Sequence, residues 1–98
     1  MVNKIKWNKA ADKTFDLITE YLQKHHSTQS AMKFANLVYK KIDQIERGQT
    51  IGRISPKAKT VMILQLDKHR QMYYRLVGTT LTIVDFWDTR QDPRKKPY

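Results

Sequence analysis

Residues 72–87, Met-Tyr-Tyr-Arg-Leu-Val-Gly-Thr-Thr-Leu-Thr-Ile-Val-Asp-Phe-Trp, decide the fold. Two runs in this stretch, Met72–Val77 and Leu81–Trp87, are rich in β-branched and aromatic residues, which is typical of strands. Gly78 and Thr79 fit a two-residue turn with glycine first. The stretch therefore predicts an antiparallel hairpin.

A third strand, Val61–Leu66, precedes the hairpin, and a three-residue connection at 68–70 is expected to join it to the next strand. The expected pairs are Leu76 with Leu81, Tyr74 with Ile83, Met62 with Leu76, Leu64 with Tyr74, and Leu66 with Met72. One face of the predicted sheet then carries Met62, Leu64, Leu66, Met72, Tyr74, Leu76, Leu81, Ile83 and the polar Asp85. The other face is amphipathic and suits a groove, with Val61, Ile63, Gln65, Tyr73, Arg75, Val77, Thr82, Val84 and Phe86.

The first half of the chain predicts a short strand and a helical hairpin. Lys4–Trp7 alternates polar and apolar residues, as a strand does. The helix over about 9–24 has an apolar stripe of Ala11, Phe15, Ile18 and Leu22, and the second helix one of Ala31, Phe34, Val38, Ile42 and Ile45. Ser27 or Ser30 is the expected N-cap of the second helix, and Gly48 stands where it should end. Residues 49–60 are expected to form a loop.

These elements predict one α+β domain over residues 1–98. The order is strand, helical hairpin, then a three-stranded antiparallel meander, with the helices on one face of the sheet.

The composition and charge of the chain exclude several classes of function. The chain has 98 residues, no cysteine and a formal net charge of +10. Disulfides, cysteine-ligated zinc and thiol catalysis are excluded, and a cytoplasmic setting is expected. The longest run without a charged residue, 76–84, is far shorter than the roughly 20 residues of a membrane span. The positive charge favours a polyanionic partner, such as nucleic acid, a ribosome or an acidic protein.

The order of elements and several short motifs resemble the RelE/ParE superfamily, the toxins of bacterial type II toxin–antitoxin modules. The motifs are Trp7 with Ala10-Ala11, Gly52-Arg53 before the second strand, Tyr73-Tyr74-Arg75, Leu81-Thr82-Ile83-Val84, and Asp88-Thr89-Arg90-Gln91-Asp92-Pro93 after the last strand. The resemblance covers nearly the whole chain. It implies growth arrest by the protein and neutralisation by a cognate antitoxin, with which it is expected to form oligomers.

Two mechanisms exist within this superfamily. RelE-like members cleave mRNA on the ribosome, and the basic stretch around the second strand favours this activity. ParE-like members bind and poison DNA gyrase without being nucleases, and residues 90–93 resemble the tail of these ParE-like members. The first interpretation is a ribosome-dependent mRNA endoribonuclease. The alternatives are a gyrase inhibitor on the same fold and a basic nucleic-acid-binding module.

For RNA cleavage, the candidate catalytic residues are Arg53, Lys57, Lys59 and Arg90. Cationic side chains can stabilise the negative charge that develops on a phosphate without a metal. Arg53 and Arg90 are expected to converge on one anionic group. The competing interpretations are a solvated basic loop for the first three residues, and an ion pair of Arg90 with Asp88 or Asp92.

Four further residues are candidate contacts to a substrate or target: His69, Tyr73, Arg75 and Tyr98. Aromatic rings can stack on bases, arginine can hold phosphates, and a histidine can transfer protons near neutral pH. His69 is nevertheless expected in a turn away from Arg53. His25 and His26 lack a third ligand nearby, so neither a metal nor any other cofactor is expected.

Overall fold

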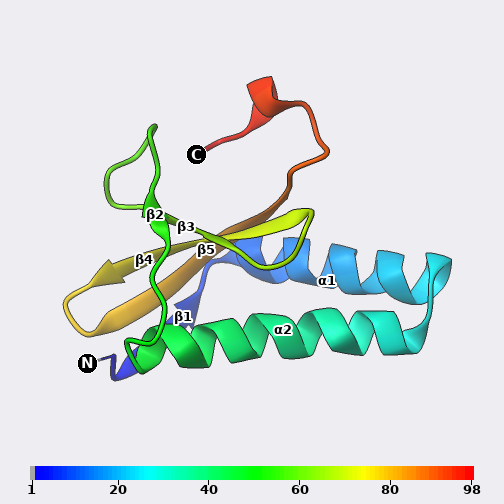
Figure 1. The fold of residues 1–98 in the computed structure, drawn as a ribbon, viewed down its shortest axis with the longest axis horizontal. Helices are drawn as coiled ribbons and strands as arrows, with labels where there is room; N and C mark the ends of the chain where they lie inside the picture. The colour runs from blue at the N-terminus through cyan, green and yellow to red at the C-terminus, as the bar shows by residue number, and fades with distance from the viewer. Residues whose placement is uncertain (1) are drawn as a thin grey trace.

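The computed structural model describes residues 2–98, and it confirms the α+β architecture with two helices against one face of a sheet (Figure 1). The elements are β1 (Lys4–Trp7), α1 (Lys9–His25), α2 (Thr28–Glu46), β2 (Arg53–Ile54), β3 (Met62–Gln65), β4 (Arg70–Val77), β5 (Thr80–Asp88) and the 3-10 turn η1 (Pro93–Lys95). The strand order is β1-β5-β4-β3-β2. β1 pairs in parallel with β5, and the other neighbours are antiparallel. β2 lies within the segment expected to be loop.

The ends of α2 follow the sequence signals. The side chain of Ser27 accepts a hydrogen bond from the backbone N–H of Ser30 at 3.0 Å, so Ser27 is the N-cap. Gly48 ends the helix with a φ of +68°. Its N–H donates to the carbonyl of Ile45, and the next N–H, of Gln49, donates to the carbonyl of Gln44. This pair of bonds is a Schellman motif, which satisfies carbonyl groups at the helix end.

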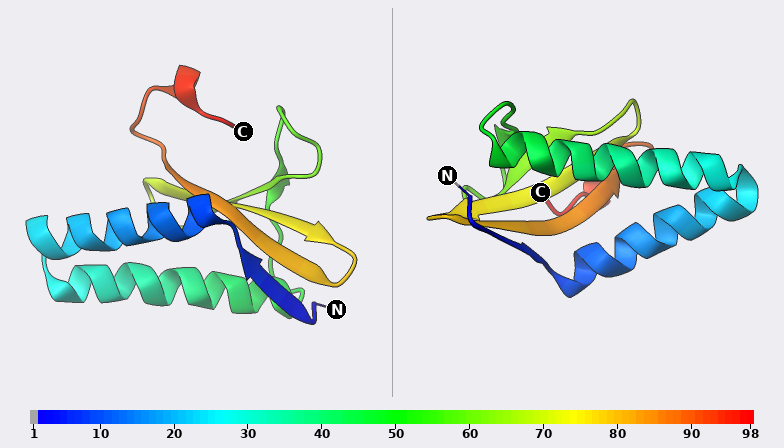
Figure 2. Two further views of the ribbon diagram at one scale, coloured as in Figure 1. Left: turned by 180° about the vertical axis from the view of Figure 1, so that it is seen from behind. Right: turned by 90° about the horizontal axis from the view of Figure 1, so that it is seen from below.

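The main core lies between the helical hairpin and the sheet. It includes the stripe residues Ala11, Leu22, Ala31, Phe34, Val38, Ile42 and Ile45, and the strand residues Leu64, Leu66, Met72, Tyr74, Leu81, Ile83 and Phe86. Phe15 and Ile18 pack against this core but are only half-buried. The two helices extend past the sheet to their connecting turn, so the last turns of α1 have no strand beneath them (Figure 2).

The register between β3 and β4 differs from the prediction by two residues. Met62 lies opposite Tyr74, and Leu64 lies opposite Met72. The connection begins one residue earlier than expected because Asp67 closes it: its carboxylate accepts hydrogen bonds from two backbone N–H groups of the turn, each at 2.9 Å. A shift of two residues keeps every side chain on its predicted face.

A β-bulge changes the predicted faces of two residues in β5. The pairs Leu76–Leu81 and Tyr74–Ile83 are as expected, but farther along Tyr73 lies opposite Asp85 and Met72 opposite Phe86. Val84 is therefore an extra residue on β5. Beyond it, Phe86 turns into the main core, although the sequence placed it on the other face. Asp85 correspondingly shares the face of Tyr73, not that of Ile83 as expected.

The face of the sheet away from the helices, here called the outer face, has a small core of its own. Val61, Ile63, Tyr73 and Val84 are buried there under Ala58, Trp87 and Tyr98. The loop between β2 and β3 and the C-terminal tail lie on this side of the sheet (Figures 1 and 2). The middle of the outer face is thus covered and is not the open groove that the sequence suggested.

Candidate functional site on the outer face

A row of paired residues crosses the outer face. Arg53 of β2 lies opposite Ile63 of β3, which lies opposite Tyr73 of β4, which lies opposite Asp85 of β5. Side chains directly opposite one another on antiparallel strands are neighbours, with Cβ atoms about 4.5–5.5 Å apart. The row therefore arranges a cation and a carboxylate on either side of the buried tyrosine.

The C-terminal tail folds back over this row. Asp92 caps η1 by accepting a hydrogen bond from the N–H of Arg94 at 3.0 Å. The chain then turns toward the sheet, where the ring of Tyr98 meets the ring of Tyr73 edge to face, with 4.9 Å between the ring centroids. The tail is thereby tied to the strands by an aromatic contact.

Two lysines meet at the same place. In the loop after β2, the hydroxyl of the buried Ser55 accepts a hydrogen bond from the N–H of Lys57 at 3.2 Å. The ammonium group of Lys57 donates to the backbone carbonyl of Lys96. Partial burial, with the nearby charges of Arg53 and Lys57, lowers the pKa of Lys96. Three cationic groups therefore share one end of the outer face.

Three buried polar atoms of β4 have no hydrogen-bond partner among the described residues: Oε1 of Gln71, the hydroxyl of Tyr73 and Nε of Arg75. Burial raises the pKa of Tyr73 strongly, and the carboxylate of Asp85 raises it further. The phenol is therefore neutral at physiological pH. Arg75 lies two residues along β4 from Tyr73, and so on the same face.

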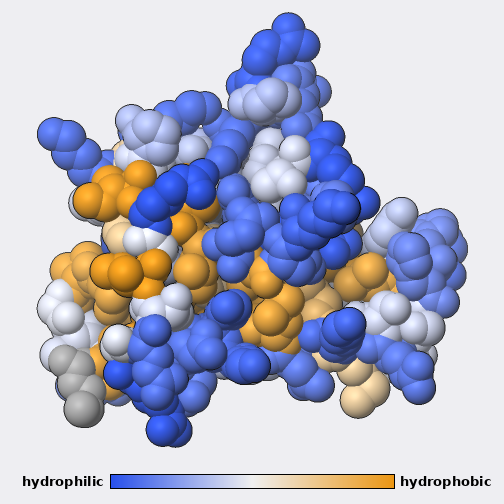
Figure 3. All heavy atoms as spheres, in the orientation of Figure 1, coloured by the Kyte–Doolittle hydropathy of each residue, from blue (hydrophilic) through white to orange (hydrophobic). Residues whose placement is uncertain are grey.

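We call the group of Arg53, Lys57, Arg75 and Lys96, together with Tyr73 and Tyr98, the cationic face. Asp85 is the carboxylate paired across from it in the row. In Figure 3 the region around the tail is almost entirely hydrophilic, whereas hydrophobic atoms gather over β2 and the far end of β4. The exposed apolar residues of those segments are Ile51, Ile54, Leu76 and Val77. An excess of positive charge around two tyrosines suits the binding of an anionic surface.

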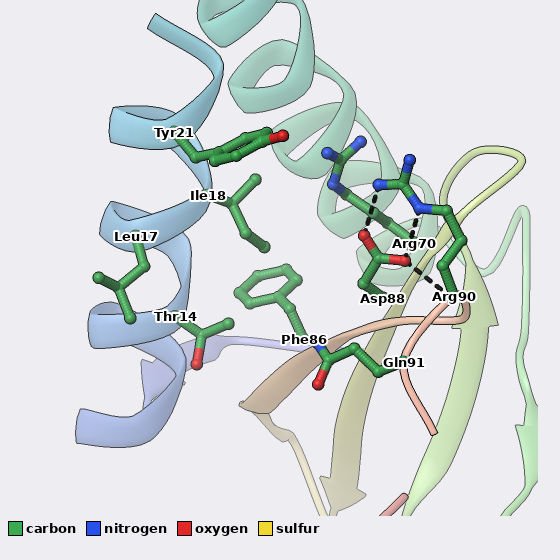
Figure 4. Close-up of a pocket in the computed structure, with 9 residues that line it drawn as sticks. All are labelled: Thr14, Leu17, Ile18, Tyr21, Arg70, Phe86, Asp88, Arg90 and Gln91. Carbon is green, nitrogen blue, oxygen red and sulfur yellow. Dashed lines mark hydrogen bonds and ion pairs between the residues drawn. The ribbon is translucent and has the colours of Figure 1, made fainter. Parts of the chain in front are cut away.

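Arg90 lies elsewhere, on the helix side of the sheet. Its guanidinium holds Asp88 at both oxygens, with Nε–Oδ1 at 3.0 Å and Nη2–Oδ2 at 2.6 Å (Figure 4). This contact lowers the pKa of Asp88. Both residues line a pocket of about 350 Å³ between α1 and the end of β5. The structure therefore does not bring Arg90 together with Arg53, and it displays the ion pair that the sequence offered as the alternative.

Of the remaining predicted residues, His69 lies away from the cationic face. His69 sits in the β3–β4 turn, where it lines a second pocket with Tyr21 and Arg90. Its carbonyl accepts a hydrogen bond from the N–H of Thr89 at 2.7 Å. Lys59 is exposed in the loop between β2 and β3. Within residues 2–98, no three histidine or acidic side chains are grouped as metal ligands would be.

Sequence reasoning missed Lys96 and Asp85 at the cationic face. Lys96 belongs to a basic tail that carries no periodic pattern, so the sequence contains no signal of its contact with Lys57. The bulge at Val84 turns Asp85 to the outer face, and strict alternation along β5 concealed it.

A family model described as the ParE toxin of the type II toxin–antitoxin system parDE matches residues 5–93. The chain belongs to the ParE toxin family. It is therefore the toxin of a type II toxin–antitoxin module, and an antitoxin is its partner. No curated protein sequence matches it significantly.

Solved structures share the fold of this ParE-family toxin. One is the chromosomal ParDE system of P. aeruginosa, with a TM-score of 0.72 and 19% identity over 87% of this chain and 94% of that one. The YoeB/ParE toxin of Agrobacterium tumefaciens has a TM-score of 0.64 and 12% sequence identity. The match covers 88% of this chain and 98% of that one. The E. coli DinJ-YafQ complex has a TM-score of 0.62 and 12% sequence identity. The match covers 92% of this chain and 96% of that one. None of the helices within residues 2–98 is long and apolar enough to span a membrane.

Proposed function

We propose that this toxin arrests growth in the cytoplasm by binding DNA gyrase through the cationic face, without cleaving RNA. The match to the ParE family over residues 5–93 supports gyrase as the target, because ParE-like members of the superfamily act on gyrase. The RelE-like activity, which the basic stretch first favoured, becomes the second candidate.

The observation that carries the proposal is the separation of the residues expected to cleave RNA. Cleavage requires charge-stabilising and proton-transferring groups around a single phosphate. Arg53 and Lys57 lie on the outer face, whereas Arg90 is paired with Asp88 on the helix side. The phenol of Tyr73, in the middle of the outer face, keeps its proton. This arrangement supports binding more than catalysis.

The chemistry of the cationic face fits a protein target with an acidic surface. Its cations can pair with carboxylates, which speeds encounter and orients the partner. Tyr98 offers a half-buried aromatic ring already packed against the sheet, and tyrosine and arginine are typical anchors of protein interfaces.

The test compares two activities of the purified toxin: inhibition of DNA supercoiling by gyrase, and cleavage of mRNA on translating ribosomes. We expect inhibition of gyrase and intact mRNA. The double variant Arg53→Ala, Lys57→Ala should weaken that inhibition at least tenfold. The matched control Lys13→Ala, Lys40→Ala removes the same charge from exposed helix positions and should inhibit as the wild type does. Equal inhibition by both double variants would show that the cationic face is not the gyrase-binding surface.

One observation favours the second candidate, a ribosome-dependent endoribonuclease. The lowered pKa of Lys96 increases the fraction of its amine that is unprotonated near neutral pH, and a general base must be unprotonated to act. If this candidate holds, the toxin cleaves mRNA on ribosomes and leaves gyrase unaffected. Lys96→Arg, which keeps the charge but not the titration, would then abolish cleavage. That result would replace the gyrase proposal.

A further inference from the structure

One end of the outer face remains open, beyond the core that Tyr98 covers. It is formed by the edge strand β1 and by the tip of the β4–β5 hairpin, which lie apart from the C-terminal tail (Figure 2). Two rows of paired residues cross it from β1 to β4: Lys6–Thr82–Arg75 and Lys4–Thr80–Val77. Residues paired in this way point to the same side of a sheet, so all six share the outer face with Tyr73. We call these six residues the basic strip.

The side chains of the basic strip are accessible. Lys4 and Lys6 are exposed, and Val77 is 63% exposed. Arg75 is half-buried, and its Nε has no hydrogen-bond partner in the part of the chain that the structure describes. Buried polar atoms normally have partners, so an arginine in this state has a donor available for a ligand.

No carboxylate neutralises the cations of the basic strip. The sequence has no acidic residue before Asp12 and none between Asp67 and Asp85, so β1, all of β4 and the first half of β5 lack them. None of the ion pairs found within residues 2–98 involves a cation of the strip. Asp85 lies on the same face but in another row, opposite Tyr73. The strip therefore presents uncompensated positive charge, which attracts a polyanion.

The spacing of the strip suits the phosphate backbone of a duplex. Residues two apart on a strand lie about 6.6–6.8 Å apart, and strands two apart lie about 10 Å apart. Double-stranded DNA carries one negative charge per roughly 1.7 Å of its axis, so an area of this size meets several phosphates. The hydroxyl groups of Thr80 and Thr82 can donate to phosphate oxygens as well.

The composition of the strip distinguishes between classes of polyanion. Proteins hold single strands by stacking bases on aromatic side chains, and no residue of the strip is aromatic. An acidic protein surface fits less well, because Val77 is the one apolar side chain that could anchor it. A duplex, whose bases are stacked internally, needs only contacts to its backbone.

We propose that the basic strip binds the phosphate backbone of duplex DNA without reading its sequence. The choice of DNA over duplex RNA rests on the proposed function, because gyrase works on DNA. Arg75 belongs to both the basic strip and the cationic face, so the two surfaces adjoin. The toxin then contacts gyrase and the DNA that gyrase holds through neighbouring parts of one face.

The test measures binding of the toxin to a short labelled DNA duplex by fluorescence anisotropy, with no gyrase present. Lys4→Ala with Lys6→Ala should weaken binding at least tenfold at low salt. The slope of log affinity against log salt should also fall by about 1.8, because each phosphate contact contributes about 0.9. The matched control Lys13→Ala, Lys40→Ala removes the same charge from exposed helix positions and should keep the wild-type slope. Equal slopes for the two double variants would overturn the proposal.

Thermal melts and light scattering report whether each variant folds and stays in solution. Lys4→Arg with Lys6→Arg keeps the charge and should bind as the wild type does. If the double alanine variant aggregates, Lys6→Gln alone should lower the slope by about 0.9.

Two competing ligands test the kind of nucleic acid. We expect single-stranded DNA and duplex RNA of the same length to bind at least threefold more weakly than the DNA duplex. Tighter binding of either one would overturn the assignment to duplex DNA.

A comparison with gyrase separates this proposal from the proposed function. Arg53→Ala with Lys57→Ala should weaken DNA binding less than the Lys4→Ala, Lys6→Ala variant does. Binding to gyrase in the absence of DNA should show the reverse order. A larger loss of DNA affinity in the Arg53 and Lys57 variant would assign DNA to the cationic face and overturn the proposal, whatever the result with gyrase.

Discussion

Tyr73 and Tyr74 are adjacent in β4 and point to opposite faces of the sheet, so each packs in a different core. Tyr74 points toward the helices, and its hydroxyl accepts a hydrogen bond from the N–H of Gly52 at 2.7 Å. Tyr73 points to the outer face, and its buried hydroxyl has no partner among residues 2–98. The hydroxyl group of Tyr74 therefore stabilises the fold, whereas that of Tyr73 does not.

We predict opposite signs for the matching substitutions. Tyr73→Phe should raise the free energy of unfolding by about 1 kcal/mol, because it removes a buried polar group that lacks a hydrogen bond. Tyr74→Phe should lower it by about 1–3 kcal/mol, because the N–H of Gly52 loses its partner. Urea unfolding of the two variants checks this, and equal effects of both would contradict it.

Alkaline pH gives an independent measure of Tyr73. Burial raises its pKa in the folded protein, so above pH 10 the unfolded chain loses this proton while the folded protein keeps it. Stability contributed by the neutral phenol is therefore present below pH 10 and falls as pH rises, by at most about 1.4 kcal/mol per pH unit.

We expect Tyr73→Phe to show a shallower decline of unfolding free energy between pH 10 and 11 than the wild type. Tyr74, whose pKa burial also raises, contributes equally to both proteins. Identical slopes in chemical denaturation would show that Tyr73 ionises as readily in the folded protein as in the unfolded chain.

At the scale of elements, the aromatic rings join the helical hairpin to the sheet. Phe34 of α2 is 4% exposed and lies 5.7 Å from the ring of Phe15 and 6.2 Å from that of Phe86, centroid to centroid. These contacts link both helices to β5 in one cluster.

Truncation of Phe34 to alanine should therefore lower the free energy of unfolding by about 3–5 kcal/mol. Met32→Ala, two residues away on the exposed side of α2, should change it by less than about 0.5 kcal/mol. The comparison is made by thermal or urea unfolding. A small effect of Phe34→Ala would mean that the hairpin is held by other contacts.

The sequence predicted the helices and the strand faces well because periodicity determines them. The stripe residues of α2 are all buried, and even the wrong β3–β4 register left its side chains on the right faces. Periodicity cannot locate an inserted residue such as Val84, so Phe86 and Asp85 were assigned to the wrong faces. Periodicity also gives no signal of β2, which is only two residues long. The contacts that Tyr98 and Lys96 of the tail make with the sheet and with Lys57 are tertiary, so no local pattern predicts them.

At the scale of the whole molecule, charge should control the encounter with the antitoxin. The net charge of +10 creates a long-range attraction for an acidic partner, and salt screens it over about 10 Å at 0.1 M. Short-range apolar contacts between the two proteins are screened far less.

We predict that raising NaCl from about 0.02 to 0.5 M slows association with the antitoxin at least tenfold and changes the dissociation rate much less. Stopped-flow fluorescence separates the two rates. If the association rate is independent of salt, the net charge does not steer the partner.

The bulge at Val84 has a consequence for how the gene can vary. One added residue lets a single strand supply Val84 to the outer core and Phe86 to the inner one. Losing that one codon would leave the reading frame and all charged residues intact. It would also leave Asp85 opposite Tyr73 and Phe86 opposite Met72, because the bulge residue has no partner on β4 and its removal makes the pairing regular. A three-nucleotide deletion at this codon should therefore remove only the Val84 side chain from the outer core, and it should be rare among mutants that escape the toxin.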